Sequence, residues 1–483
     1  MTVTVTRTSD VSRGAFTTLA GQLARFALQF LGLVFLARLL SPQDYGLIAM
    51  VTAIIGVGEV VRDFGLSSAA VQSDTFNTAQ RSNLFWINAA IGVLLATTCF
   101  ACAGPIADWY GHPTLRAIVQ ALSVTFLFNG MATQYRASLN RDLRFGKLAA
   151  CDTGAQALAL AIAIGLAVTG AGFWSLVAQQ LVQSAALLVL LVVMGAWLPR
   201  RYDRTQTVRE HLRFGWALMA TQLLGYVSRN VDNVIIGQRF GAGPLGVYSR
   251  AYQLLLLPLN QLNAPSTTVA LPLLSRSRSD RELYNHRLLR GQSIMVILLC
   301  CVFGFAGGEA PQVVALLFGP RWASVAPLFA ILAFAGGFQA VSYATYWVFL
   351  SRAKTGSNLV FSTVSRAVVI ASLFVGAHWG PEGVAIGYAA SLGLVWPLGL
   401  LWVTIVAEAP GWAMFLSGLR AYLLGLVGGL LCLTVSALLA APAWAELLSG
   451  AFAFALYLFA VSSVVAPIRR DVLSIWAMVR SVV

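Results

Sequence analysis

The chain has 483 residues, of which 58% are hydrophobic and only 10% are charged, and its mean hydropathy is +0.77. These values exclude an ordinary soluble domain, in which about 25% of the residues are charged. The net charge of +14 does not indicate nucleic-acid binding here. The basic residues gather in alternate loops, which is how membrane topology is encoded.

Continuous apolar runs of about 20 residues indicate transmembrane helices, whereas a membrane β-barrel would alternate polar and apolar residues. Before a basic linker at residues 198–213, six helices are predicted at residues 15–40, 45–66, 82–104, 114–138, 148–169 and 172–197. Eight more follow, at residues 214–240, 245–274, 291–309, 324–350, 357–378, 382–406, 415–440 and 444–466. We therefore predict an all-α integral membrane protein with about 14 transmembrane helices and a short tail at residues 467–483.

The sequence contains an internal repeat. A shift of 200 residues places Gln22-Leu23 on Gln222-Leu223, and Gly46-Leu47 on Gly246-Val247. This shift predicts two parallel six-helix repeats and two additional helices, covering residues 1–197, 214–406 and 407–466. Transporters often bind their substrate at the interface of such repeats and move the two halves around it.

Basic residues predict the orientation in the membrane. If the N-terminus is cytoplasmic, the basic residues in outward-facing segments are only Arg38, Arg116, Arg239 and Arg321. All other Lys and Arg lie in inward-facing segments or inside predicted helices. By the positive-inside rule, both termini, the linker and the tail are therefore cytoplasmic.

A Gly- and Pro-rich corner at residues 241–244 joins two long helices, and the first of them carries a polar stripe. Helical spacing puts Gln222, Tyr226, Arg229 and Asn233 on one face. Asp232 follows Arg229 by three residues, so the two can pair along the helix. Because a charge is costly to bury in hydrocarbon, the stripe holds either a self-neutralising ion pair or a functional site.

Four arginines lie inside predicted helices: Arg25, Arg229, Arg250 and Arg366. Gln22 shares a face with Arg25, and Asp232 is the only acid expected near the four at mid-depth. A cavity with surplus positive charge suits an anionic head group, because the guanidinium fork matches phosphate oxygens. Each arginine alone could instead extend its charged head to a membrane interface.

Two further features each allow two interpretations. Helix 245–274 contains Pro258, Pro265 and Pro272 on one face, which predicts either static kinks or a bending gate helix. The cytoplasmic end of helix 45–66 carries an acid–base cluster of Glu59, Arg62 and Asp63. Glu59 can pair with Arg62 at helical spacing, and the cluster is either a gate or an interfacial anchor.

Signals for catalysis and metal binding are missing from the sequence. It contains no G-x-x-x-x-G-K-[ST], H-E-x-x-H or G-x-S-x-G motif, the signatures of P-loop proteins, metalloproteases and hydrolases. Cys99 and Cys102 have a metal-like spacing but no accompanying pair or histidine. We therefore expect no catalytic residue, no metal site and no cofactor, and a protein that is not an enzyme.

Four segments resemble a known family: Leu40–Gly46, Asp63–Gln72, Asp232–Gly237 and Leu245–Tyr252. In their order and spacing they are similar to the polysaccharide transporter (Wzx-type) flippases of the multidrug/oligosaccharidyl-lipid/polysaccharide exporter superfamily. The pattern looks closest to the colanic acid and exopolysaccharide branch. The likeness extends over nearly the whole chain, including its length, its number of spans and its duplication.

The resemblance implies export of undecaprenyl-diphosphate-linked oligosaccharide repeat units across the bacterial inner membrane by alternating access. The product would serve exopolysaccharide, capsule or O-antigen (lipopolysaccharide) biosynthesis, with a polysaccharide polymerase and a chain-length regulator as candidate partners beside the lipid-linked glycan and the bilayer. The implied substrate-binding residues are Arg25, Arg229, Arg250, Arg366, Gln22, Tyr226 and Asn233. Those implied for ion coupling or gating are Asp232, Glu59, Arg62 and Asp63.

Two alternative functions stay open. A cation-coupled multidrug exporter of the same superfamily would prefer acidic residues in its cavity, whereas arginine predominates here. A membrane-embedded polysaccharide polymerase or acyltransferase would belong to a different class, and polymerases usually carry a sizeable periplasmic loop. No predicted connection in this chain is much longer than residues 198–213, which favours an exporter.

Overall fold

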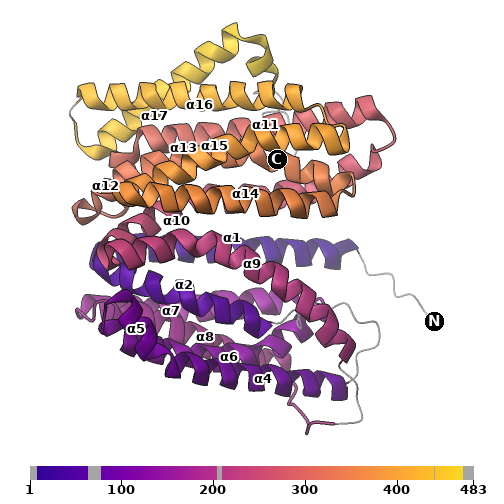
Figure 1. Cartoon of the computed structure of the whole chain (residues 1–483), viewed down its shortest axis with the longest axis vertical. Coiled ribbons are helices and arrows are strands. Elements are labelled where there is room, and N and C mark those ends of the chain that lie inside the picture. The colour runs from indigo at the N-terminus through magenta and orange to yellow at the C-terminus, as the bar shows by residue number, and fades with distance from the viewer. Residues whose placement is uncertain (1–7, 64–77, 204–208, 440, 472–483) are drawn as a thin grey trace. The chain divides into compact units, whose positions relative to one another are not determined.

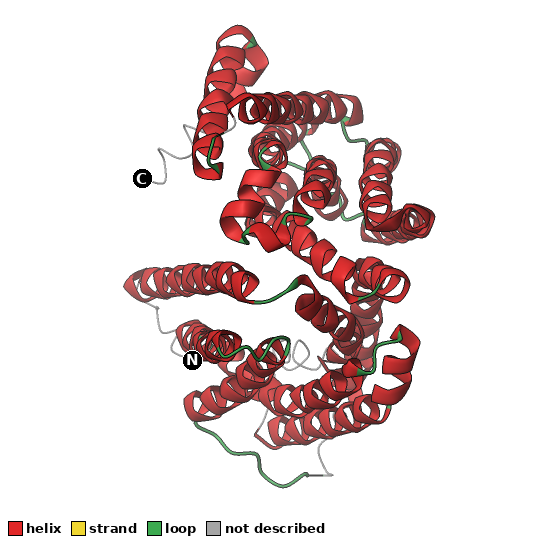
Figure 2. Ribbon diagram, turned by 90° about the vertical axis from the view of Figure 1, so that its left-hand side faces the viewer, coloured by secondary structure: helices red, strands yellow, loops and turns green. Residues whose placement is uncertain are grey.

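The computed structural model of the chain describes residues 8–63, 78–203, 209–439 and 441–471. Within them, the side chains of residues 8–20, 63, 78, 209–218, 220 and 221 lie outside the description. The described residues form sixteen α-helices and two short 3₁₀ helices, and no strand occurs among them (Figure 2). The prediction of an all-α protein is confirmed.

Fourteen long helices of the described chain match the fourteen predicted spans in order. They are α1 (Thr8–Leu39), α2 (Pro42–Asp63), α4 (Thr78–Ala101), α6 (Thr114–Arg141), α7 (Phe145–Val168), α8 (Trp174–Gly195), α9 (Arg209–Phe240), α10 (Ala242–Arg276), α11 (Arg281–Gly308), α13 (Val325–Ser351), α14 (Thr355–Gly376), α15 (Gly380–Ala407), α16 (Gly411–Leu439) and α17 (Ala443–Val464). Two short helices, α5 (Ala103–Tyr110) and α12 (Ala310–Leu317), lie between them.

Most of these helices are long and apolar enough to cross a membrane. Within the described residues eleven segments meet that description, and one of them, Thr355–Ala407, contains both α14 and α15. Helices α9 and α10 are not among the eleven, because charged and polar side chains interrupt their apolar residues. The chain is a multi-pass helical membrane protein.

The helices form two compact units, Met1–Gly246 and Val247–Val483. In the first unit α4 packs against α6, α7 lies between α1 and α8, and α2 packs against α9 (Figure 1). In the second unit α11 packs against α16, while α15 contacts both α13 and α14. The division into repeats at residues 1–197 and 214–406 stays a prediction.

The predicted corner between two long helices is confirmed. Helix α9 ends at Phe240 and α10 begins at Ala242. Gly241 between them has φ +84°, a left-handed backbone conformation that glycine adopts without steric penalty.

A reciprocal contact joins the first residues of α2 and α10. A Cβ added at Gly46 would lie 1.7 Å from the carbonyl oxygen of Ala242, and one added at Gly246 would lie 1.8 Å from that of Pro42. The positions 42 and 242, like 46 and 246, are related by the 200-residue shift. Each helix therefore presents equivalent positions to the other, an arrangement that is typical of two-fold symmetry.

The chain after α8 is fixed along α4. The side-chain amide of Asn83 donates to the carbonyl of Asp203 at 2.7 Å, and its oxygen accepts from the Asp203 N–H at 2.8 Å. The Trp86 indole N–H donates to the carbonyl of Arg200, and the Arg200 N–H donates to the hydroxyl of Ser82. Asn83 is fully buried, so these bonds stabilise the first residues of the linker against the helix.

Replacing Asn83 by alanine should release this segment. The change removes the two hydrogen bonds between the Asn83 side chain and the Asp203 backbone, and a hydrogen bond of this kind contributes about 0.5–1.5 kcal/mol. We expect faster tryptic cleavage after Arg200 and Arg201, located by mass spectrometry of the digest. Asn140→Ala, at an exposed position of α6, is the control. Equal cleavage rates in both variants would show that Asn83 does not hold the linker.

Candidate functional site

Helices α1 and α7 approach each other closely because small residues meet along their contact. A Cβ added at Gly21 would lie 2.7 Å from the Cβ of Ala149, and one added at Gly32 would lie 3.1 Å from the Leu160 side chain. From the first contact to the second, the residue number increases by the same amount in α1 and in α7, so the contact continues along both helices. One turn beyond the Gly21–Ala149 contact, this close approach brings Arg25 of α1 opposite Asp152 of α7.

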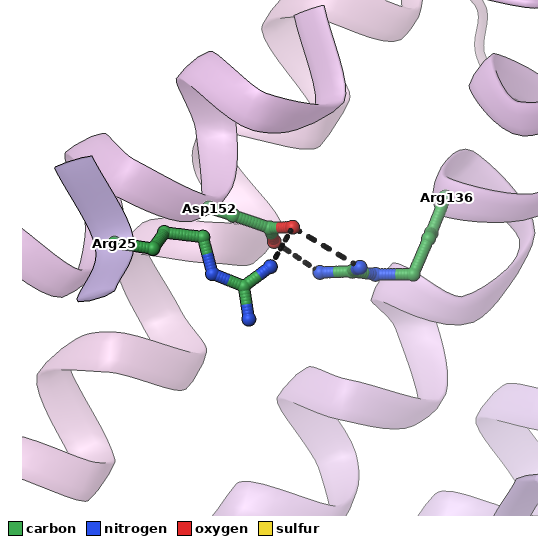
Figure 3. Close-up of polar contacts among 3 residues, drawn as sticks. All are labelled: Arg25, Arg136 and Asp152. Carbon is green, nitrogen blue, oxygen red and sulfur yellow. Dashed lines mark hydrogen bonds and ion pairs between the residues drawn. The ribbon is translucent and has the colours of Figure 1, made fainter. Parts of the chain in front are cut away.

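Asp152 joins two arginines from two different helices. Its Oδ2 atom accepts hydrogen bonds from Arg25 Nη1 at 3.4 Å and from Arg136 Nη1 at 3.3 Å. Its Oδ1 atom accepts from Arg136 Nη2, so Arg136 of α6 binds the carboxylate with both tips of its fork. Figure 3 shows the three side chains converging on this carboxylate. We name Arg25, Arg136 and Asp152 the arginine cluster.

The arginine cluster carries a net positive charge, because one carboxylate faces two guanidinium groups. Both arginine side chains are 45% exposed, whereas Asp152 is 14% exposed. Each guanidinium has five N–H donors, so donors remain for another anion. Two fixed guanidinium groups of this kind suit the oxygens of a phosphate or diphosphate.

A second polar cluster joins α2 to α6. Arg62 Nη2 lies 2.8 Å from Glu59 Oε2, and the amide of Asn129 donates to Glu59 Oε1 at 3.0 Å. This ion pair is the one that the helical spacing of Glu59 and Arg62 allows. Asp63, predicted to belong to the same cluster, has a side chain outside the described residues. A role of this cluster in gating stays a prediction.

The polar stripe of α9 faces α2. The hydroxyl of Tyr226 donates to the carbonyl of Thr52 at 2.9 Å, and a Cβ at Gly56 would lie 1.9 Å from that hydroxyl. Tyr226 therefore lies against α2, the helix that carries the Glu59–Arg62 pair, within one unit of the fold.

Asp232 and Asn233 follow on the same helix. Asp232 is buried, with 4% of its surface exposed, and its Oδ1 accepts the backbone N–H of Asn233 at 2.8 Å. The side-chain amide of Asn233 donates to Asn230 at 3.4 Å. Arg229 itself is exposed. An ion pair between Arg229 and Asp232 stays a prediction.

The other predicted site residues are divided between the two units. Gln22 lies on α1 of the first unit and is exposed. Arg250 on α10 and Arg366 on α14 belong to the second unit, and both are half-buried. A single cavity that contains all four predicted arginines therefore stays a prediction.

The family described as "Polysaccharide biosynthesis protein" matches residues 35–327, which is more than half of the chain. The chain belongs to this family. Its resemblance to the Wzx-type polysaccharide transporters is thereby confirmed.

Two relatives of this family member match most of its length. The lipopolysaccharide biosynthesis protein WzxC of Escherichia coli (strain K12) is 24% identical over 73% of this chain and 72% of WzxC. The succinoglycan biosynthesis transport protein ExoT of Rhizobium meliloti (strain 1021) is 26% identical over 87% of this chain and 84% of ExoT.

Solved transporters share the fold of this family member. An inward closed conformation of the lipid II flippase MurJ matches with a TM-score of 0.69 at 15% identity, covering 91% of this chain and 98% of MurJ. An inward-facing MATE family multidrug resistance transporter of the MOP superfamily matches with a TM-score of 0.62 at 13% identity, covering 79% of this chain and 94% of the transporter. At these identities, the likeness shows the fold alone.

The acid that pairs with Arg25 was not predicted from the sequence. Asp232 was the only acid expected near the intramembrane arginines, whereas Asp152 forms an ion pair with Arg25. Arg136, inside the predicted helix 114–138, was not among the candidate site residues. Both residues lie near predicted helix ends, and only the neighbouring positions of α1, α6 and α7 reveal that they meet.

Proposed function

We propose that this chain is a flippase that moves undecaprenyl-diphosphate-linked oligosaccharide repeat units from the cytoplasmic to the periplasmic leaflet of a bacterial inner membrane. It would work by alternating access and supply exopolysaccharide, capsule or O-antigen biosynthesis. Membership of the polysaccharide biosynthesis family supports the proposal, as do the transport relative ExoT and the flippase fold.

The arginine cluster is the observation that carries this proposal. A diphosphate presents several anionic oxygens, and paired guanidinium forks bind such oxygens with charge-assisted hydrogen bonds. Arg25 and Arg136 keep their orientation through Asp152 and remain half exposed. An uncharged drug would gain nothing from this charge, and a cationic drug would be repelled by it.

The remaining candidate residues have later roles in the proposed cycle. Arg229, with Gln22, Tyr226 and Asn233, would bind the substrate in the first unit, while Arg250 and Arg366 would bind it in the second. Asp232 would couple an ion, and the Glu59–Arg62 pair with Asp63 would act as a gate. Both termini would lie in the cytoplasm, as the distribution of basic residues predicts.

Deletion of the gene tests the function directly. We expect the lipid-linked repeat unit to accumulate in the cytoplasmic leaflet and polymer output to stop. The leaflet can be assigned with a membrane-impermeant glycan label on spheroplasts. Increased drug sensitivity without a lipid-linked intermediate would instead indicate the multidrug exporter.

Replacing Arg229 by alanine should abolish export while the protein stays in the membrane, because one cationic position for the head group is lost. Polymer output and membrane protein level are measured in the complemented deletion strain. Arg239→Ala, which removes another exposed arginine of α9 near its end, should export normally. Normal polymer output from Arg229→Ala would remove Arg229 from the substrate path.

A further inference from the structure

A cavity of about 700 Å³ lies within the second unit, between the second half of α10, the first half of α11 and the end of α13. This volume falls in the range of about 300–1,000 Å³ that is common for small-molecule sites. Its walls are mainly apolar, and include Leu262, Val269 and Leu273 of α10, Ile294 and Leu298 of α11, and Trp347 of α13. We name it the α10–α11 groove.

Hydrogen bonds at two places hold α10 beside the α10–α11 groove. Thr267 of α10 accepts a hydrogen bond from the indole N–H of Trp347 at 3.0 Å. Nearer the end of α10, Arg287 Nη1 of α11 donates to Ser277 Oγ at 2.7 Å and to the Leu273 carbonyl at 3.3 Å. The groove is therefore a fixed part of the unit, bounded by these contacts.

Positive charge lies at one end of the groove. Arg287 and Arg290, three residues apart and so on one face of α11, both line it. Arg290 is exposed. Among the described residues, neither arginine takes part in an ion pair. The groove thus combines an apolar channel with two guanidinium groups that have no carboxylate partner within the described part of the chain.

We infer that the α10–α11 groove binds an anionic glycerophospholipid of the bilayer, with its phosphate on Arg287 and Arg290 and an acyl chain between α10 and α11. Basic pockets between transmembrane helices bind anionic lipid head groups in this way. The orientation predicted from the basic residues assigns the lipid to the cytoplasmic leaflet. This inference does not depend on which substrate the protein exports.

Native mass spectrometry of the purified full-length protein tests this assignment. Phosphatidylglycerol and phosphatidylethanolamine with identical acyl chains are titrated separately. Both head groups carry the same ionised phosphate, but phosphatidylethanolamine also carries an ammonium group that the two arginines repel. We therefore expect phosphatidylglycerol, with its net negative charge, to bind about tenfold more tightly. Arg290→Ala should abolish this preference, because it removes a cation that supports no internal contact of the groove. Lys354→Ala, which removes one charge from an exposed loop, should retain it.

A second variant tests the contribution of the lipid's acyl chain separately from that of its head group. Ala270→Trp would fill the groove, whose wall includes Ala270, while both arginines stay in place. We expect it to lose bound phosphatidylglycerol. Equal affinity for the two lipids in the wild type, or an unchanged preference in Arg290→Ala, would overturn the inference. Displacement of phosphatidylglycerol by undecaprenyl phosphate through the same two arginines would also overturn it, because the groove would then serve the exported lipid.

Discussion

We expect export of the lipid-linked repeat unit to fall about tenfold to a hundredfold when Arg25 is replaced by alanine. A hydrogen bond to a charged group contributes about 1.5–3 kcal/mol, and Arg25 is half exposed beside Asp152, so its loss removes binding to the diphosphate. The stability of the protein should change little, because partly exposed ion pairs contribute about 1 kcal/mol or less. Polymer output, normalised to the membrane protein level, measures the effect.

Three further variants make this prediction specific. Arg136→Ala should reduce export to a similar extent, whereas Arg25→Lys should restore part of it by keeping the charge without the fork. The matched control is Arg144→Ala, because Arg144 is also half exposed at the same end of the unit and lies 3.9 Å from Asp142. Wild-type output from Arg25→Ala at normal protein level would exclude the arginine cluster from the substrate site.

Asp152 should act as a positioning residue in this cluster. Asp152→Asn keeps the size of the side chain but removes the charge that holds the two guanidinium groups together. We therefore expect lower export and weaker inhibition by inorganic diphosphate, with the protein still folded. A variant that exports normally and is inhibited by diphosphate as strongly as the wild type would show that Asp152 has only a structural role.

The helices were predictable from the sequence because membrane insertion depends on local properties. An apolar run of about 20 residues spans the bilayer whatever its neighbours are, so all fourteen long helices could be located. The corner at Gly241 was predictable for a similar reason, since glycine and proline determine backbone geometry over a few residues. Even α9, whose charges lower its hydropathy, was found by the apolar residues around Arg229.

The arginine cluster could not be predicted, because it depends on which helices are neighbours. The residues Arg25, Arg136 and Asp152 are far apart in the sequence, and no helical spacing relates them. What brings two of them together is the close approach at Gly21 and Ala149, and small residues are too common in membrane helices to identify a contact pair. Arg136 also lies near the end of a predicted helix, where the positive-inside rule by itself accounts for a basic residue, so its position did not indicate an ion pair with Asp152.

The reciprocal contact between α2 and α10 should tolerate no side chain at Gly46 or Gly246. In each position an added Cβ would lie less than 2 Å from a backbone oxygen, and backbone cannot move aside as a flexible side chain can. We expect Gly46→Val and Gly246→Val each to lower the free energy of unfolding by about 1–3 kcal/mol and to impair export. Thermal unfolding in detergent measures the first effect. Gly243→Ala is the control, because a Cβ there meets nothing within 4 Å.

The double variant distinguishes one shared contact from two independent ones. If Gly46 and Gly246 belong to a single two-fold contact, the first substitution already separates the helices, and the second adds little. Residues that share a contact deviate from additivity, whereas distant sites add within about 0.3–0.5 kcal/mol. We therefore expect the Gly46→Val/Gly246→Val variant to unfold near the temperature of the less stable single variant. Fully additive losses would show that the two glycines take part in two separate contacts.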